Sequence, residues 1–378
     1  MKIDCIDDLQ GLRALSGAWD AVLSQSSHDH VCFSFTWLST WWQAFGKTRR
    51  LMILTARDGN NTVRAIAPLM QSRVRLCGLA VRRIGFIYND NASRADLIDG
   101  GCNGEMVRDT VSYLTKNASA WDVVDLENIW EGSQTYKNLI DALKEARLCF
   151  CVKDGLHSPY VSVQGDWQAY FSSRSKNVHK TFRNIRNRLK NKGPWSVENG
   201  RSMEDNALAR IYSISRQSWK GRCRKDITAS AEDKDFYELL TDTTGKQGWL
   251  HLWFLKVNNE YVAYEYALEY KNRMYALKAD FNESYRDLAP GIMLHTHIMK
   301  YCFEHGIKEY DLCGHDEDYK KRWATQIRSH KRIVIYRSGL YGRLLYFLDY
   351  RTGYCVKAML KRSSALKRLK RYIARRVG

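Results

Sequence analysis

The spacing of apolar residues along the chain alternates between that of a helix and that of a strand. Helical spacing is clear at 9–23, where Leu12, Leu15 and Trp19 share one face. Strand-like runs follow at 51–56 and 62–71, on either side of a turn that contains Gly59. The first half continues with alternating helices and strands, predicted in the order helix 104–116, strand 122–126, helix 133–146, strand 149–153. This alternation predicts a layered α/β fold.

The second half opens with an amphipathic helix inside the basic run 174–192, because Val178, Phe182, Ile185 and Leu189 form an apolar stripe on it. Three strands and a helix that begins after Pro290-Gly291 are then expected. The elements predicted after the basic helix are strands 249–257, 261–270 and 274–281, helix 292–305, strand 308–312, short helix 319–325 and strand 332–336.

The order of these elements matches that of a GNAT acyltransferase: three antiparallel strands, a loop that opens a helix, a strand, a helix and a strand. The chain also resembles the BioF/CelD-like acetyltransferases, which are similar in build to the FemAB aminoacyl ligases. The matching segments are the aromatic stretch 33–46, Ala67-Pro68-Leu69, the helix 175–186, Ser218-Trp219-Lys220-Gly221, Ala289-Pro290-Gly291, Asp311-Leu312-Cys313-Gly314, and Tyr319-Lys320 followed by Trp323.

This resemblance implies an α/β tandem GNAT-like fold with mixed central sheets flanked by helices. We expect a first GNAT-like half over 1–158, an acyltransferase half over 159–338, and a basic amphipathic tail over 339–378. Since the first half has no loop like Pro290-Gly291, we predict that it shapes the acceptor cleft or is structural.

The turn before the helix at 292 is the candidate donor site. In GNAT enzymes the pantetheine arm of acyl-CoA lies between two diverging strands, and its pyrophosphate lies at a helix start, where free N–H groups and the dipole favour anions. The residues that we expect to bind acetyl-CoA or another acyl-CoA here are Arg286, Pro290, Gly291 and Ile292. The superfamily pattern carries more glycines than this turn, which leaves an aminoacyl-tRNA donor open, and an ordinary Pro-Gly helix start is the structural alternative.

Three residues are candidate catalytic groups. Asp280 ends the third strand, where a carboxylate can accept a proton from an amine. Glu265 lies on the preceding strand and is expected to point into the same cleft, unless its strand face is solvated. By resemblance, Lys320 contacts a substrate phosphate or a developing negative charge; the alternative is a surface lysine above a core tryptophan.

Further residues are candidates for substrate binding. The resemblance implies that Trp323 walls the pocket and that Tyr319 lies beside it, and His315 is a loop histidine that could act there. Trp219, Lys220 and Arg183 are assigned to the acceptor. No cysteine spacing suits a metal, so no metal site is predicted.

Charge narrows the choice of partners. The chain has 378 residues and a net charge of +19, concentrated in 174–192 and in the tail. Both runs favour an anionic partner, and the tail has the pattern of a helix that lies on an anionic bilayer, although solvated helix faces are the simpler alternative. Scattered cysteines, an acidic N-terminus and the lack of a long apolar run indicate the cytoplasm, with peripheral contact at the inner membrane face.

These features favour an acyl-CoA-dependent N-acyltransferase acting on an amine acceptor, such as a cell-envelope sugar, a lipid or a polysaccharide precursor. A FemAB-type enzyme that uses aminoacyl-tRNA is the second hypothesis, and a non-catalytic membrane- or nucleic-acid-binding GNAT scaffold is the third. The acceptor cannot be read from the pattern of residues alone.

Overall fold

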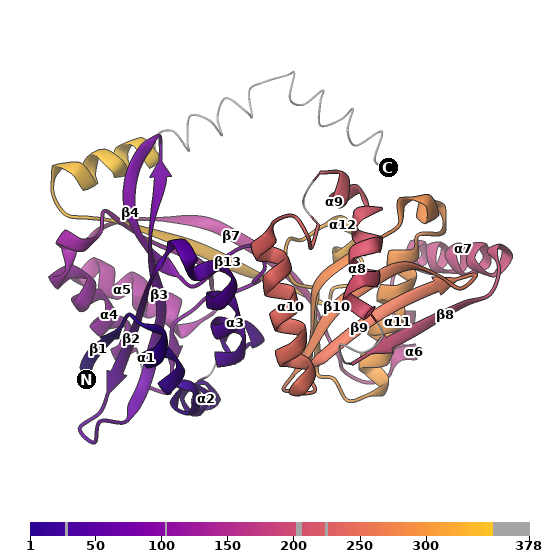
Figure 1. Cartoon of the computed structure of the whole chain (residues 1–378), viewed down its shortest axis with the longest axis horizontal. Helices are drawn as coiled ribbons and strands as arrows, with labels where there is room; N and C mark the ends of the chain where they lie inside the picture. Colours follow the sequence, from indigo (N-terminus) through magenta and orange to yellow (C-terminus); the bar gives the residue numbers. More distant parts are fainter. Residues whose placement is uncertain (27–28, 103, 202–205, 224–225, 351–378) are drawn as a thin grey trace.

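One continuous sheet runs through the whole molecule. The computed structural model describes residues 1–350 except 27–28, 103, 202–205 and 224–225. In this part of the chain thirteen strands form a single sheet in the order β1-β2-β3-β4-β6-β13-β7-β12-β11-β10-β9-β8, with β5 paired to β3. Figure 1 shows two lobes that are joined by the long strands β7 and β13. The predicted mixed α/β architecture is confirmed.

The first half follows the predicted order of elements, with a few differences. The helix expected over 9–23 is divided at Leu15, the strands expected over 62–71 and 149–153 extend to Leu76 and Ser162, and an additional strand pairs the N-terminus to the sheet. The elements are β1 (Lys2–Ile6), α1 (Leu9–Ala14), α2 (Ser16–Gln25), η1 (Val31–Phe33), α3 (Phe35–Phe45), η2 (Gly46–Thr48), β2 (Arg50–Arg57), β3 (Val63–Leu76), β4 (Leu79–Phe86), β5 (Ile98–Asp99), α4 (Glu105–Lys116), η3 (Ala118–Ala120), β6 (Val123–Trp130), α5 (Gln134–Glu145) and β7 (Cys149–Ser162).

The predicted elements of the second half occur in the predicted order. Its last strand begins earlier than expected, at Gln326, and the edge strand Trp195–Gly200 and the short helix Trp167–Ser172 were not predicted. The elements are α6 (Trp167–Ser172), α7 (Lys176–Lys192), β8 (Trp195–Gly200), α8 (Ala207–Arg216), α9 (Trp219–Arg222), α10 (Ala231–Lys246), β9 (Leu250–Val257), β10 (Glu260–Tyr270), β11 (Arg273–Phe281), η5 (Glu283–Leu288), α11 (Pro290–Glu304), β12 (Glu309–Asp311), α12 (Asp318–Lys321) and β13 (Gln326–Tyr336).

The two halves repeat one arrangement. In the first, the antiparallel strands β2, β3 and β4 are followed by α4 and by β6, which pairs in parallel with β4. In the second, the antiparallel strands β9, β10 and β11 are followed by α11 and by β12, which pairs in parallel with β11. Such parallel pairs require a crossover connection, and a helix supplies it in both halves. This internal repeat is the tandem GNAT-like build.

The halves exchange strands at their junction. β13, from the end of the second half, lies between β6 and β7 and is antiparallel to both. The far end of β7 in turn pairs with β12 of the second half. Neither half therefore completes its sheet alone. The domain boundary at residue 158 stays a prediction, and the shared sheet continues across it.

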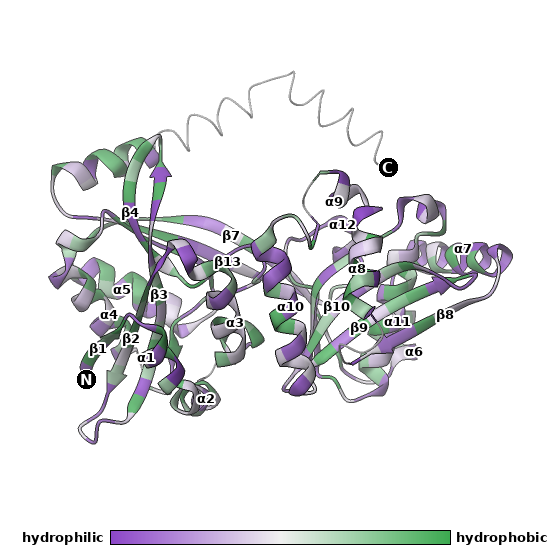
Figure 2. Cartoon of the chain, viewed as in Figure 1, coloured by the Kyte–Doolittle hydropathy of each residue, from purple (hydrophilic) through white to green (hydrophobic). Residues whose placement is uncertain are grey.

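Apolar side chains fill the spaces between the sheet and its helices. Strands inside each lobe, such as β2 and β10, are mostly buried, whereas β7 and β13 between the lobes carry many hydrophilic residues (Figure 2). Trp19, Trp37 and Trp41 are fully buried between the first helices and the sheet, and one continuous core joins them to α10 of the second half through Phe236. A second core lies between β9–β12 and the helices α7 and α11.

A buried carboxylate holds the junction together. Asp311, at the end of β12, is fully buried. Its Oδ2 lies 3.0 Å from Nη2 of Arg94, 3.6 Å from Nη1 of Arg328 on β13 and 3.9 Å from Nε2 of His30. Ser158 of β7 donates to the same carboxylate at 3.2 Å. Burial alone would raise the pKa of Asp311, but the hydrogen bond with His30 and the charges of Arg94 and Arg328 outweigh burial and lower that pKa.

We predict that Asp311→Asn lowers the free energy of unfolding by about 3–5 kcal/mol, because it leaves buried cations without their counter-charge. The measurement is urea unfolding at neutral pH. Asp316→Asn is the control, since Asp316 lies in a solvated loop and pairs with the exposed Lys321. Equal, small losses for the two variants would contradict the structural role of Asp311.

Candidate active site

The sheet opens between β11 and β12. Their parallel pairing joins Arg273–Tyr275 to Glu309–Asp311, whereas β11 continues to Phe281. Residues 276–281 therefore have β10 on one side and, within the described chain, no strand on the other. The β10–β11 register shifts between Tyr266 and Ala267, so Leu277 bulges out of the ladder at the start of this opening. Backbone groups along the free edge of 276–281 have no strand partner within the described chain.

Asp280 is the centre of a polar cluster on one face of this opening. Its Oδ1 lies 3.1 Å from Nζ of Lys220, and its Oδ2 accepts from the hydroxyl groups of Tyr264 at 3.2 Å and Ser215 at 3.4 Å. Lys220 also donates to the carbonyl of Ala279 at 2.7 Å, at the end of β11. The structure thus brings together Asp280 and Lys220, which were predicted separately as catalytic and acceptor-binding residues.

Burial changes the proton affinities of this cluster. It raises the pKa of Asp280, and the charge of Lys220 only partly counteracts this effect. Lys278, two residues earlier on β11, has its pKa lowered by burial and by the charge of Lys220. A carboxylate with a raised pKa next to an amine with a lowered pKa is the pairing expected of proton-transfer groups.

Glu265 lies on the opposite face of the sheet. Tyr264 is the cross-strand partner of Asp280, so its neighbour Glu265 must point away from Asp280. Glu265 accepts from the hydroxyl of Tyr310 and lies 3.3 Å from Nδ1 of His295, on α11. All three side chains are buried, and Nε2 of His295 has no hydrogen-bond partner among the described residues.

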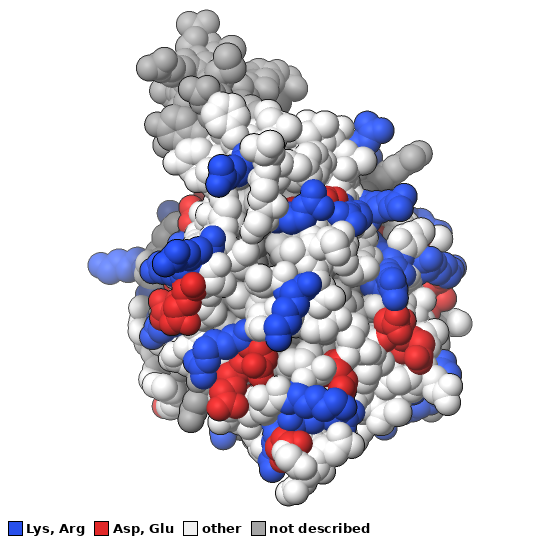
Figure 3. Space-filling view, turned by 90° about the vertical axis from the view of Figure 1, so that its left-hand side faces the viewer, with Lys and Arg blue, Asp and Glu red and all other residues white. Residues whose placement is uncertain are grey.

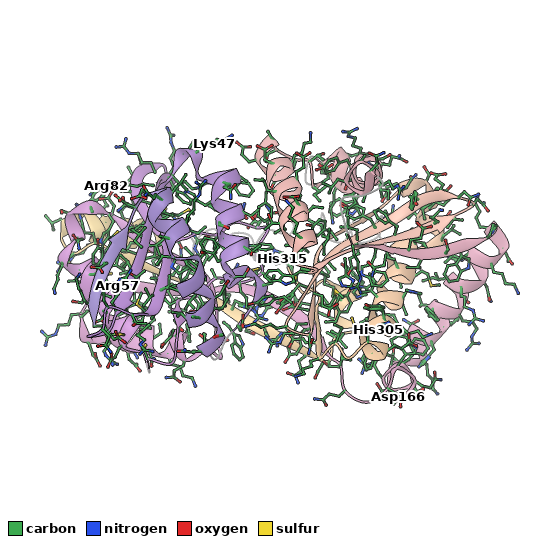
Figure 4. All side chains as sticks on the ribbon, turned by 60° about the horizontal axis from the view of Figure 1, so that its bottom comes forward. Lys47, Arg57, Arg82, Asp166, His305 and His315 are labelled. Carbon is green, nitrogen blue, oxygen red and sulfur yellow. The ribbon has the colours of Figure 1, made fainter. Side chains whose placement is uncertain are left out.

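The loop after β12 is held by Lys320. Its Nζ donates to the carbonyls of Cys313 at 2.8 Å and His315 at 3.3 Å and pairs with Glu317 at 2.9 Å. The side chain is almost fully buried, so its donors serve the loop instead of a substrate phosphate. His315 itself is exposed and lies between the two lobes in Figure 4.

Tyr319 lies beside the Glu265 cluster. Its ring centre is 6.3 Å from that of His295, and 43% of the residue is exposed. Burial of its hydroxyl raises the pKa of Tyr319, and the charges of Glu317, Glu265 and Asp280 add to that effect.

The start of α11 faces open space. Ala289 has a left-handed backbone (φ 44°), and no side chain caps the helix. A Cβ added at Gly291 would meet only Cδ1 of Phe281, at 3.6 Å. Pro290 is buried and Ile292 packs on the second core, whereas Arg286 is exposed beside Glu283 at 3.9 Å. The geometry suits an anionic group at the helix start, with Gly291 leaving room and Arg286 at the rim.

The remaining predicted residues are dispersed. Trp323 is a core residue, packed against Phe171, and its carbonyl accepts from Tyr170 and Arg174. Trp219 is 48% exposed on α9, next to Lys220. Arg183 is exposed on α7 and is not part of the opening between β11 and β12. Trp219 thus adjoins the site, while Trp323 supports it from within.

Sequence reasoning missed His295, Tyr310, Tyr264 and Lys278. His295 and Tyr310 meet Glu265 from 30 and 45 residues away, and periodicity carries no information about such contacts. Tyr264 and Lys278 lie one residue before Glu265 and two before Asp280. Both residues would have been identified from the register of the β10–β11 hairpin if the bulge at Leu277 had been predictable.

Comparison with known proteins agrees with this geometry. Residues 176–321 match a family described as Acetyltransferase (GNAT) domain. The chain carries a GNAT acetyltransferase domain. The opening, the candidate donor turn and Asp280 all lie inside it, and this match supports an acyltransferase.

Solved structures share the fold of the entire chain around this GNAT domain. FemX is 14% identical and aligns over 92% of this chain and 99% of its own, with a TM-score of 0.59. A conserved protein of unknown function from Bacteroides thetaiotaomicron VPI-5482 is 12% identical over 89% of this chain and 100% of its own, with a TM-score of 0.58. The C-terminal domain of a putative lysylphosphatidylglycerol synthetase from Agrobacterium fabrum is 10% identical over 90% and 96%, with a TM-score of 0.53. The curated proteins include no match.

We predict that Lys320→Met destabilises the GNAT domain by about 1–3 kcal/mol, because it leaves the carbonyls of Cys313 and His315 without their donor. The measurements are thermal unfolding and proteolysis of the 313–318 loop. Lys321→Met is the matched control, since the neighbouring Lys321 is exposed and pairs with Asp316 at 2.8 Å, a contact worth less than about 1 kcal/mol. A Lys320 variant with unchanged stability but weaker substrate binding would instead support the direct phosphate contact expected from the sequence.

Proposed function

We propose that this protein is an acyl-CoA-dependent N-acyltransferase whose site is the opening between β11 and β12. The observation that carries the proposal is the free edge of β11 over 276–281, which ends beside both Asp280 and the uncapped start of α11. Along such an edge an extended, amide-bearing arm can form strand-like hydrogen bonds, while N–H groups at the helix start receive phosphate.

The residues of the site fit acyl transfer to an amine. Asp280 accepts a proton from the acceptor's ammonium group, which frees the nitrogen lone pair. The N–C bond then forms as the C–S bond of the thioester breaks, and the second proton lost by nitrogen ends on the departing sulfur. N–H groups of the bulged segment around Leu277 stabilise the oxyanion that develops in between. Glu265, His295 and Tyr310 hold the far wall of the opening.

The acceptor in this proposal is a cell-envelope amine such as an amino sugar, an amino lipid or a polysaccharide precursor. We place the reaction in the cytoplasm. All nine cysteines among the described residues are free. None of the helices in the described ranges is long and apolar enough to cross a membrane.

Contact with an anionic membrane surface is a further part of the proposal. Residues 340–350 are helical, and Leu340, Leu344 and Phe347 are exposed at helical spacing while Leu345 packs on the sheet. The basic tail that follows, from 351 onward, lies outside the described residues. An apolar stripe beside a basic segment is typical of interfacial helices.

An aminoacyl-tRNA donor is the second candidate. Two observations favour it: the donor turn has a single glycine, and α7 presents exposed cations that include Arg183. A phosphate backbone binds such a surface without sequence preference.

Calorimetric titration with acetyl-CoA tests the donor. We expect micromolar binding that is lost in Gly291→Trp, because the indole fills the space in front of α11. Gly59→Trp is the control, since a Cβ there meets nothing within 4 Å and the turn lies in the first half. Equal binding by both variants would contradict the site, and absence of binding by the unaltered protein would favour aminoacyl-tRNA.

We predict that Asp280→Asn still binds acetyl-CoA in the same titration. In a rate measurement, the variant transfers the acyl group to an amine acceptor about 10²–10⁴-fold more slowly, which is the usual contribution of a general base. The rate of the unaltered enzyme rises with pH through the raised pKa of Asp280, because only the carboxylate accepts a proton.

A further inference from the structure

Two adjoining cavities lie beside the candidate site and share Thr48 and Arg49 in their walls. The first, of about 690 Å³, extends from Lys278 of β11 to the start of α10 and η2. The second, of about 590 Å³, continues from η2 along β3 and β4 of the first half. Each is as large as a typical small-molecule site. Together they connect the opening of the second half with a surface of the first half to which sequence analysis assigned no ligand.

The cavity next to Lys278 is acidic. Its walls carry Asp90, Asp226, Glu232 and Asp233. Asp233 is fixed by Asn91 at 2.8 Å and by Ser230 at 2.8 Å, so its carboxylate is held in place without a cation. This end of the cleft attracts an ammonium group and leads it towards the Asp280 cluster.

The other cavity is basic. Five arginines line it and no acidic residue does: Arg49, Arg50, Arg73, Arg82 and Arg83. Three of them are neutralised by carboxylates outside the cavity wall, since Arg50 pairs with Asp7, Arg82 with Asp122, and Arg83 with Asp125 and Glu127. Arg49 and Arg73 form no ion pair with the residues that the structure describes, which leaves two uncompensated positive charges in one cavity.

The placement of Arg73 is unfavourable for the fold alone. It is the direct cross-strand partner of Arg82 in the β3–β4 ladder. Like charges directly opposite each other destabilise a sheet. In Figure 3 basic side chains extend across the upper part of this end of the molecule, while acidic side chains lie mainly in its lower part. An anion bound between the strands would remove the repulsion.

Arg49 is held rigidly at the border of the two cavities. Its guanidinium lies 5.3 Å from the ring centre of Trp41 and donates to the carbonyl of Phe45. Burial, and then the charge of Arg83, lower the pKa of Arg49. Figure 4 shows Arg82 and the exposed Lys47 towards the same edge of the first half. A fixed, planar guanidinium of this kind suits bidentate recognition of phosphate.

We propose that the joined cavities bind an acceptor that carries both an amine and a phosphate or pyrophosphate group. The phosphate lies beside Arg49 and Arg73, and the amine lies at the acidic end, in the cavity that Lys278 also lines. The amine half of this inference rests on the proposed acyltransferase function, while the anion site in the first half does not.

Calorimetric titration with inorganic pyrophosphate tests the anion site. We expect saturable binding that weakens at least tenfold in the double variant Arg49→Gln/Arg73→Gln. The matched control is Arg13→Gln/Arg108→Gln, which removes the same charge from exposed positions of the same half and should change affinity less than twofold. No saturable binding, or equal losses in the two double variants, would overturn the anion site.

Acetyl-CoA titration of the same variants identifies the source of the phosphate. Unchanged acetyl-CoA affinity in Arg49→Gln/Arg73→Gln supports an acceptor site, whereas a parallel tenfold loss would show that the arginines hold the donor and would overturn the proposal. If pyrophosphate binds and acetyl-CoA does not, the acyl-CoA function fails while the anion site stands.

A series of ω-aminoalkyl phosphates tests the amine half, with alkyl phosphates of equal length as controls. We expect the amine to improve displacement of pyrophosphate at least threefold at the length that spans the two cavities. No improvement at any length would overturn the assignment of the acidic end.

Discussion

The buried carboxylate of Asp311 is the interaction on which the rest of the structure depends. It meets Arg94 of the first half, Arg328 of β13 and Ser158 of β7, so it joins the strands that the two halves exchange. Its Oδ1 also accepts from the backbone N–H of Cys313 at 2.9 Å, which starts the loop that Lys320 then holds. Because a charge this deeply buried needs all its partners, the junction and the loop form together or not at all.

The candidate site follows from this constraint. β12 ends at Asp311, and β11 continues past it, so the position of Asp311 sets where the sheet opens. The loop that leaves Asp311 brings Tyr319 to that opening, while the first half contributes Arg49 and Asp90 to the adjoining cavities. The GNAT domain alone therefore has a donor turn and Asp280 but lacks half of the proposed acceptor cleft. In this proposal the first half helps to shape the acceptor cleft, which is one of the two roles predicted for it from its sequence.

Much of the fold was predictable because the local patterns agree with it. Apolar spacing predicted most helices and strands, and the order of elements indicated the GNAT topology. The faces of the β10–β11 hairpin were not predictable, because the bulge at Leu277 changes the register and places Glu265 away from Asp280. Lys320 illustrates the other limit: its position in a motif suggested a substrate contact, but its donors are used by the carbonyls of Cys313 and His315. Arg49 and Arg73 were missed because residues distant in sequence line one cavity without forming a charge run.

The central claim is that the free edge of β11 and the start of α11 form one donor site. Hydrogen exchange of the whole chain with and without acetyl-CoA tests it most directly, because both elements present backbone N–H groups. The account predicts slower exchange on binding at 276–281 and in the first turn of α11, with no comparable change at the equivalent pair of strands in the first half, β4 and β6. Protection confined to β4, β6 or α7, with none at 276–281, would contradict it.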